Sequence, residues 1–125
     1  YSSLGKAHLA EKAYRQALKY NPQYTKARYN LGILMLENEQ WEDAITLFQS
    51  IINHNPEHAE AVFNLGRAYY GARKYENALA SYQDAIRVRQ GNYPEAYLNI
   101  GLVHKSQHRY DEAVDSYMNA IKLQE

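Results

Sequence analysis

The stretch "YNLGILMLENEQWEDAITLFQS", residues 29–50, returns twice further along the chain. A close copy, "FNLGRAYYGARKYENALASYQD", begins at Phe63, and a third, "LNIGLVHKSQHRYDEAVDSYMN", begins at Leu98. The first glycines of the three copies lie 34 and then 35 residues apart. A period of this length is typical of a solenoid, in which each unit buries its apolar face against the next unit.

Each copy predicts two helices joined by a short turn. In the first copy, Leu31 and Met35 lie on one stripe of a helical segment. After the polar turn "ENEQ", Ala44, Phe48 and Ile51 follow at i, i+4 and i+7, which is the spacing of a buried helical face. Because the turn is short, we expect the two helices to run antiparallel. Asn55-Pro56 should end the second helix, since the residue before proline avoids the α region.

Small and aromatic residues recur at fixed places in the copies. Alanine follows each glycine by twelve residues, and an aromatic ring follows the alanine by four. We expect the glycine and the alanine to lie where two helix backbones cross closely, with the ring filling the wider gap beside them. The alanines are Ala44, Ala78 and Ala113. Trp41, Tyr75 and Tyr110 precede these alanines, and we interpret most of the 13 tyrosines as packing residues.

The pattern of Leu-Gly, a large residue three positions later, then alanine, aromatic, alanine and proline resembles the tetratricopeptide repeat. The resemblance implies an all-α, right-handed superhelical solenoid of antiparallel helix pairs. It covers the whole chain as one domain, 1–125, which we divide into a partial repeat, 1–24, and full repeats 25–58, 59–93 and 94–125. The partial repeat keeps Ala10, Tyr14, Ala17 and Pro22 at the family spacing. Because the chain opens within the pattern, we expect it to be a fragment of a longer protein.

The second full repeat is one residue longer than the first and lacks the terminal proline. The difference lies in "RQGNYPEA". We expect Gly91-Asn92 to make the turn there and Pro94 to open the next helix, because proline is tolerated at the first helical position. The predicted consequence is a small change in the orientation of the next repeat.

Composition excludes several classes of function. The 125 residues are 46% hydrophobic, with 14 basic and 14 acidic side chains and no cysteine. Balanced charge argues against nucleic acid as the main partner, and the absence of cysteine excludes disulfides and thiolate chemistry. No apolar run approaches the roughly 18 residues of a membrane span, and no targeting segment is visible. We therefore expect a soluble protein with no membrane partner; the compartment is not readable, with the cytoplasm slightly favoured.

Chemistry-bearing motifs are missing from the sequence. Nucleotide-binding glycine loops, serine-nucleophile motifs and zinc-protease motifs do not occur. His54 and His58, like His104 and His108, have the i, i+4 spacing of a metal-binding pair. However, Pro56 separates the first pair, the second pair reaches into a turn, and no carboxylate completes either set. We therefore predict a non-enzymatic chain without a metal or other cofactor.

In the tetratricopeptide repeat family the first helix of each unit lines the concave face, where partners dock. Exposed apolar side chains on such a face indicate an interaction site. The resemblance implies a peptide-binding groove made of Tyr29, Asn30, Ile33, Leu36, Phe63, Asn64, Arg67, Tyr70, Leu98, Asn99, Leu102 and Lys105.

One asparagine per repeat stands two residues before the glycine, giving Asn30, Asn64 and Asn99. Helices pack about 8–10 Å apart and an extended chain advances about 3.3–3.6 Å per residue, so each amide would meet every third residue of a bound peptide. This is similar to the asparagine ladder of O-GlcNAc transferase. The alternative is that these amides hydrogen-bond locally.

The family's carboxylate clamp for chaperone tails is absent. It requires lysine where this chain has Tyr29 and asparagine where it has Ile33, and it requires basic residues in the third unit at Glu95 and Asn99. We therefore expect a scaffold that binds an apolar or mixed protein segment. Two alternatives remain open: self-association, and a substrate-selecting module of a larger enzyme such as a glycosyltransferase.

Overall fold

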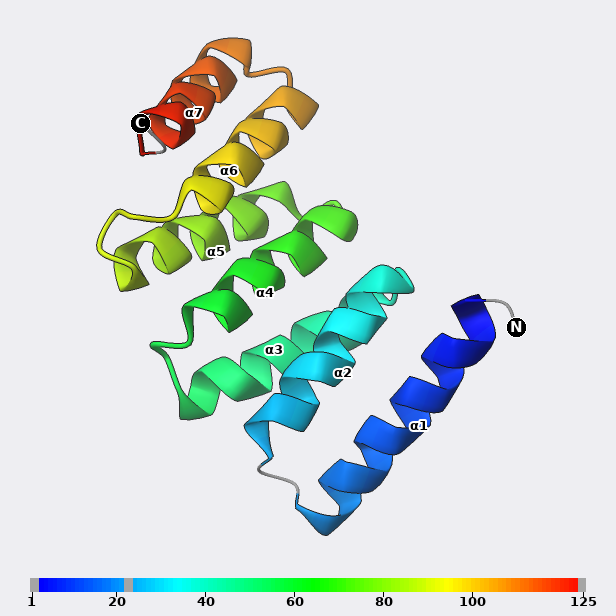
Figure 1. Cartoon of the computed structure of the whole chain (residues 1–125). Helices are drawn as coiled ribbons and strands as arrows, with labels where there is room; N and C mark the ends of the chain where they lie inside the picture. Colours follow the sequence, from blue (N-terminus) through cyan, green and yellow to red (C-terminus); the bar gives the residue numbers. More distant parts are fainter. Residues whose placement is uncertain (1–2, 22–23, 124–125) are drawn as a thin grey trace.

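The computed structural model describes residues 3–21 and 24–123. Over these residues the chain forms seven α-helices and no strand. The helices are α1 (Ser3–Tyr20), α2 (Thr25–Glu37), α3 (Trp41–His54), α4 (Ala59–Gly71), α5 (Tyr75–Val88), α6 (Pro94–Ser106) and α7 (Tyr110–Leu123). Figure 1 shows them stacked in chain order, with α1 and α7 at the two ends of the stack. The predicted all-α solenoid of helix pairs is confirmed.

The contacts between helices determine which of them line the inside of the stack. Each helix packs on its neighbours in the chain. Beyond these pairs, contacts within the described residues join only α2 to α4 and α4 to α6, while α3, α5 and α7 do not reach one another. In a curved stack the elements on the inner side approach each other most closely. Helices α2, α4 and α6 therefore form the inner face.

Two predicted helix boundaries are confirmed. Helix α3 ends at His54, directly before Asn55-Pro56. Helix α6 begins at Pro94, where the missing N–H of proline costs nothing. Gly91 makes the preceding turn with a φ of +88°, a conformation in which glycine has no Cβ to clash.

The three inner helices end in the same turn. Glu39, Arg73 and His108 follow α2, α4 and α6 with φ between 61° and 62°. The next amide in each turn bonds back to a carbonyl five residues earlier, at 2.8 Å in all three cases. This is the pattern of a Schellman cap, which usually has glycine at the left-handed position. Here three non-glycine residues adopt that conformation.

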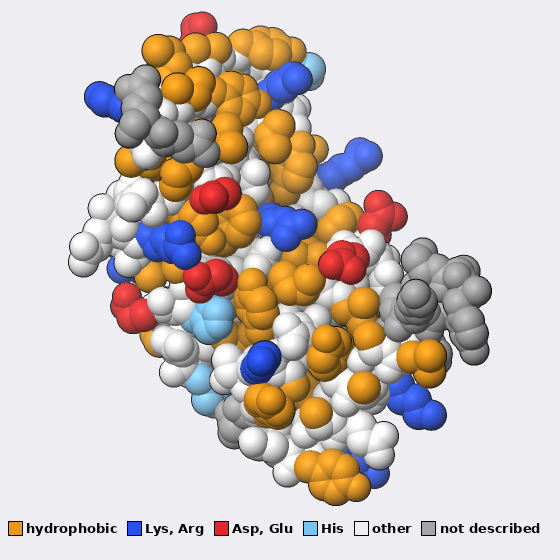
Figure 2. All heavy atoms as spheres, in the orientation of Figure 1, with side chains coloured by type: hydrophobic (Ala, Val, Ile, Leu, Met, Phe, Trp, Pro, Cys, Tyr) orange, Lys and Arg blue, Asp and Glu red, His pale blue; other side chains and the backbone are white. Residues whose placement is uncertain are grey.

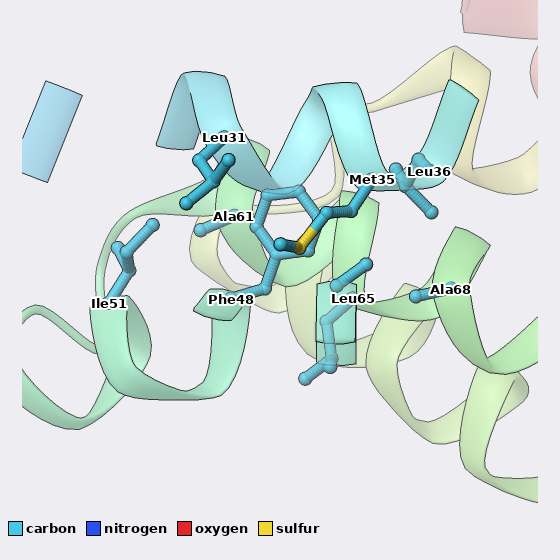
Figure 3. Packing of buried hydrophobic residues seen from close by; sticks show 9 residues of the cluster. Leu31, Met35, Leu36, Phe48, Ile51, Ala61, Leu65 and Ala68 are labelled. Atoms are coloured by element: carbon cyan, nitrogen blue, oxygen red, sulfur yellow. The ribbon is translucent and has the colours of Figure 1, made fainter. Parts of the chain in front are cut away.

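The core of the first full repeat is built around Phe48. Its ring is fully buried and lies among Leu31 and Met35 of α2 and Leu65 of α4 (Figure 3). Burial of a ring of this size stabilises the fold by about 1.5–3 kcal/mol. The same side chain thus joins two helices of one repeat to the first helix of the next.

The repeated alanines and glycines lie at close contacts, but for different reasons. Ala44, Ala78 and Ala113 are buried as expected. For the glycines our expectation of a close backbone crossing was wrong. A Cβ on Gly66 would lie 2.6 Å from a ring carbon of Tyr82, and Gly32 and Gly101 face Phe48 and Tyr117 in the same way. The glycine therefore makes room for the aromatic ring of its own repeat.

The aromatic residues that begin the outer helices have different packing partners: Trp41 contacts the following repeat, whereas Tyr75 contacts Tyr70 of its own repeat. A Cβ on Gly71 would lie 2.4 Å from Trp41, and the Tyr75 ring lies 5.7 Å from that of Tyr70. Tyr110 is 56% exposed, so the prediction that it is a packing residue was wrong. The reason is that no described helix follows α7 to cover it.

Candidate functional site

The inner face carries a mixture of apolar and charged side chains. Figure 2 shows hydrophobic atoms running along this side of the stack, interrupted by separate acidic and basic groups. The twelve residues predicted to line a groove differ in exposure. Leu36 and Asn64 are buried, Tyr29, Asn30, Ile33, Phe63, Tyr70 and Asn99 are half-buried, and Arg67, Leu98, Leu102 and Lys105 are exposed.

A cavity of about 400 Å³ opens between the helix pairs. This volume lies within the range of small-ligand and side-chain pockets. Its lining comes from five helices, α2 to α6, and five of the eight lining residues belong to the predicted groove. The lining residues are Leu36, Trp41, Arg67, Tyr70, Gly71, Tyr82, Asn99 and Leu102.

Asn64 is the centre of a hydrogen-bond network below this surface. Its side chain is 4% exposed. The amide nitrogen donates to the Tyr29 hydroxyl at 2.9 Å, and the amide oxygen accepts from Arg67 Nη1 at 2.9 Å. Burial raises the pKa of Tyr29, and the hydrogen bond from Asn64 opposes that rise. An asparagine amide has two donor hydrogens, and one of them is used in the bond to Tyr29.

The three asparagines of the predicted ladder have different surroundings. Asn30 and Asn99 are half-buried, whereas Asn64 is buried. Burial raises the pKa of the Tyr82 phenol well above its usual range, and a hydrogen bond with Asn99 opposes that rise. Local hydrogen bonding, the alternative raised from the sequence, therefore applies to Asn64.

A second aromatic cluster surrounds Phe63. The Phe63 ring stacks on the Tyr93 ring with centroids 5.1 Å apart. The Arg89 guanidinium carbon lies 4.2 Å from the centroid of the Tyr93 ring. Arg89 also donates to a Glu60 oxygen at 2.8 Å. Burial raises the pKa of Tyr93 to about 12, against the lowering effect of Arg89. The longer repeat thus places Tyr93 against a groove residue.

Neighbouring inner helices are joined by hydrogen bonds as well as by apolar packing. The Tyr70 hydroxyl on α4 lies 2.7 Å from the Ser106 hydroxyl on α6. Tyr29 on α2 also stacks on His58, directly before α4, with ring centroids 5.4 Å apart. These contacts fix the spacing of the inner helices and hence the width of the surface between them.

Three residues of the cavity wall, Trp41, Gly71 and Tyr82, lie outside the twelve predicted groove residues. Trp41 and Tyr82 were assigned to packing alone, yet both line the cavity. The sequence position of Trp41 could have indicated that it lines the cavity, because Trp41 begins the outer helix α3 directly after the turn that follows the inner helix α2. No sequence signal could have identified Tyr82, because a ring at a core position reaches the cavity only when the helices around it are arranged to expose it there.

Neither histidine pair forms a metal site within the described residues. No group of three or more histidine, cysteine, aspartate or glutamate side chains is arranged to hold a metal in that part of the chain. His58 instead accepts a hydrogen bond from the Ala61 amide at 3.1 Å and caps α4. No described helix combines the length and the apolar character that a membrane span requires.

Family models identify the repeats. Two models described as tetratricopeptide repeat match the chain, one at residues 3–61 and one at residues 34–92 and 63–124. The chain belongs to the tetratricopeptide repeat family. No curated protein sequence matches it. Members of the tetratricopeptide repeat family mediate protein–protein interactions, and this chain is a scaffold of that kind.

Solved structures of MamA have the same tetratricopeptide repeat architecture. The structure of MamA from residue 41 to its end, from Desulfovibrio magneticus RS-1, is 21% identical with a TM-score of 0.89, and the match covers 97% of this chain and 68% of that one. A second MamA crystal structure is 27% identical with a TM-score of 0.86, covering 97% and 70%. The tetratricopeptide repeat chain described here thus spans about two thirds of the length of these proteins.

Proposed function

We propose that this chain is a non-catalytic scaffold that holds a peptide or helical segment of a protein partner along its inner face. The observation that carries the proposal is the cavity of about 400 Å³ between the helix pairs, with apolar and aromatic walls and one arginine. Leu98 and Leu102 extend the apolar surface along α6, where they are exposed. Exposed apolar side chains beside a cavity are typical of interaction sites.

The asparagines are proposed to contact the backbone of the bound segment. Asn30 and Asn99 are half-buried residues of the inner helices α2 and α6. Asn64 would contribute the amide hydrogen that does not bond to the Tyr29 hydroxyl. A neutral hydrogen bond contributes about 0.5–1.5 kcal/mol. The triple alanine variant should therefore lose about 2–4 kcal/mol of affinity if the three losses add.

The test compares two exposed positions, one on the inner helix α6 and one on the outer helix α7. Peptides selected from a displayed random library against the wild-type chain are titrated into Leu102→Asp, on the inner face, and Val114→Asp, on the outer helix α7. These side chains are 42% and 52% exposed. A carboxylate at an apolar contact should weaken binding about tenfold or more for Leu102→Asp only. Loss of binding in Val114→Asp alone would move the site to the outer helix.

Self-association is a second candidate function, and the outer side of α7 favours it. Val114, Met118 and Ile121 follow one another at i, i+4 and i+7 and are all exposed. The counterparts of Val114 and Ile121 in α5, Leu79 and Ile86, pack in a cluster with residues of α6. A second copy of the chain would cover this stripe. Light scattering over a concentration series distinguishes this from a monomeric scaffold, and Met118→Lys should abolish any concentration dependence.

A further inference from the structure

Arg67 is one of several described cations without an acidic partner, and it is the one that lines the cavity between the helix pairs. Ion pairs within the described residues involve Arg15, Lys74, Arg87, Arg89 and Arg109. None of the described carboxylates pairs with Arg67, although its side chain lines the cavity. A guanidinium has five N–H donors in a planar fork. One of them is used, in the bond to Asn64, which leaves the others for a ligand.

The position of Arg67 is fixed by a hydrogen bond to a buried side chain. Asn64, which accepts its hydrogen bond, is 4% exposed and is held in turn by the Tyr29 hydroxyl. The guanidinium is therefore anchored at one edge by the 2.9 Å bond from Nη1. Anchoring reduces the rotamer entropy that binding would otherwise cost. A pre-positioned and unpaired guanidinium is well suited to a carboxylate.

Apolar groups surround the same cation. Leu36 and Trp41 line the cavity from one repeat, and Tyr70 and Leu102 line it from the next two. The Trp41 ring packs directly against Gly71, where a Cβ would collide with the ring. An apolar side chain entering the cavity would thus contact aromatic and aliphatic walls while Arg67 lies beside it.

We propose that the groove selects a partner segment with an aspartate or glutamate beside an apolar or aromatic side chain. This inference rests on the proposed function. The carboxylate pairs with Arg67 and the apolar group fills the cavity. We assign the carboxylate to a side chain within the partner segment, because Phe63 and Tyr70 continue the inner face one turn before and one turn after Arg67 on α4. The partner chain therefore has a surface to follow in both directions.

Short synthetic peptides provide the probes. In an extended chain residues i and i+2 point to the same side, so the probe is acetyl-Gly-Asp-Ser-Phe-Ser-Asp-Gly-amide, which reads alike in both directions. One matched peptide replaces both aspartates by asparagine, and another replaces the phenylalanine by alanine. Trp41 is the only tryptophan of the chain and lines the cavity, so its emission reports binding at this site.

The expected result is a preference of about three- to tenfold for the aspartate peptide over the asparagine peptide, and this preference should shrink at high salt. Arg67→Met should abolish the preference, and Arg67→Lys, which keeps the charge without the fork, should reduce it. Arg87→Met removes an exposed arginine from α5 outside the cavity and should change nothing. The peptide with alanine in place of phenylalanine should bind more weakly than the aspartate peptide to every variant.

Several outcomes would overturn the inference. Equal binding of the aspartate and asparagine peptides to the wild-type chain would show that Arg67 does not select a carboxylate while groove binding stands. A preference that persists in both Arg67 variants would show the same. If Ser-Phe peptides with a free C-terminal carboxylate bind and the internal aspartate does not help, the carboxylate belongs to a chain end. Absence of any Trp41 response to all peptides would count against groove binding itself.

Discussion

Helices α5 and α7 occupy equivalent places in consecutive repeats, but their apolar faces have different environments. Leu79 on α5 is 7% exposed and packs with Ile100 and Val103 of α6. Val114, the equivalent residue on α7, is 52% exposed. The difference arises because α6 covers α5, whereas no described helix covers α7. The repeat pattern thus provides each outer helix with an apolar face, and the following repeat determines whether that face is buried.

Truncating the two equivalent side chains should separate these environments most strongly. Leu79→Ala leaves a cavity against α6 and should lower the free energy of unfolding by about 2–4 kcal/mol. Val114→Ala removes an exposed side chain and should change it by less than about 0.5 kcal/mol. Urea denaturation followed by circular dichroism measures both. Similar losses in the two variants would mean that α7 is covered in solution.

Adding a methyl group at the repeat glycines should give a smaller difference. In Gly66→Ala the new Cβ meets the fully buried ring of Tyr82, so we expect a loss of about 1–3 kcal/mol. In Gly101→Ala it meets Tyr117, which is only half-buried and can move away. The loss there should be less than half as large. Thermal melts of both variants test this ordering, which equal losses would contradict.

The acidic residues at the starts of α4 and α6 provide a comparison that depends on pH. A backbone hydrogen bond and then Arg89 hold the pKa of Glu60 below its ordinary value of 4.5. A lowered pKa contributes stability above the unfolded value, and this contribution disappears as the pH falls through the folded value. Glu60→Gln should therefore lower the free energy of unfolding at neutral pH, with no difference from wild type in strong acid.

The size of this effect is limited because the Glu60 side chain is 49% exposed and solvent screens its charge. We expect less than about 1 kcal/mol. Glu95 stands at the equivalent position on α6 and forms no ion pair among the described residues, so Glu95→Gln is the matched control. Denaturation at several pH values checks the prediction. A Glu60→Gln difference that persisted unchanged into strong acid would mean that packing rather than charge is responsible.

The smallest expected effect concerns the turns that follow α4 and α6. Arg73 and His108 both adopt a left-handed conformation, which strains a side chain with a Cβ. Replacing either residue by glycine should raise the free energy of unfolding by about 0.5 kcal/mol, after the entropy cost of glycine. The gain for His108→Gly should be slightly smaller, because its ring bonds to the Tyr110 hydroxyl at 3.0 Å. A loss of stability in Arg73→Gly would show that the Arg73 side chain contributes more than its strained backbone costs.

The sequence alone was sufficient for the helices and their pairing. Local rules set the boundaries: Asn55-Pro56 ends α3 and Pro94 begins α6. The periodic apolar positions identified the buried faces, including Ala44 and Phe48. These features depend on residues within one or two helical turns of each other, so their spacing in the chain carries the information.

Tertiary structure decided what each repeated position does. Asn30, Asn64 and Asn99 look alike in the sequence, but Asn64 is buried because the Tyr29 hydroxyl and the Arg67 guanidinium converge on it. Those partners are 35 residues before Asn64 and 3 residues after it. The side chains on the packed faces of a solenoid contact the neighbouring repeat, and the repeats differ in the residues they present there. The environment of a repeated residue is therefore a property of the pair of repeats, which the pattern within one repeat does not contain.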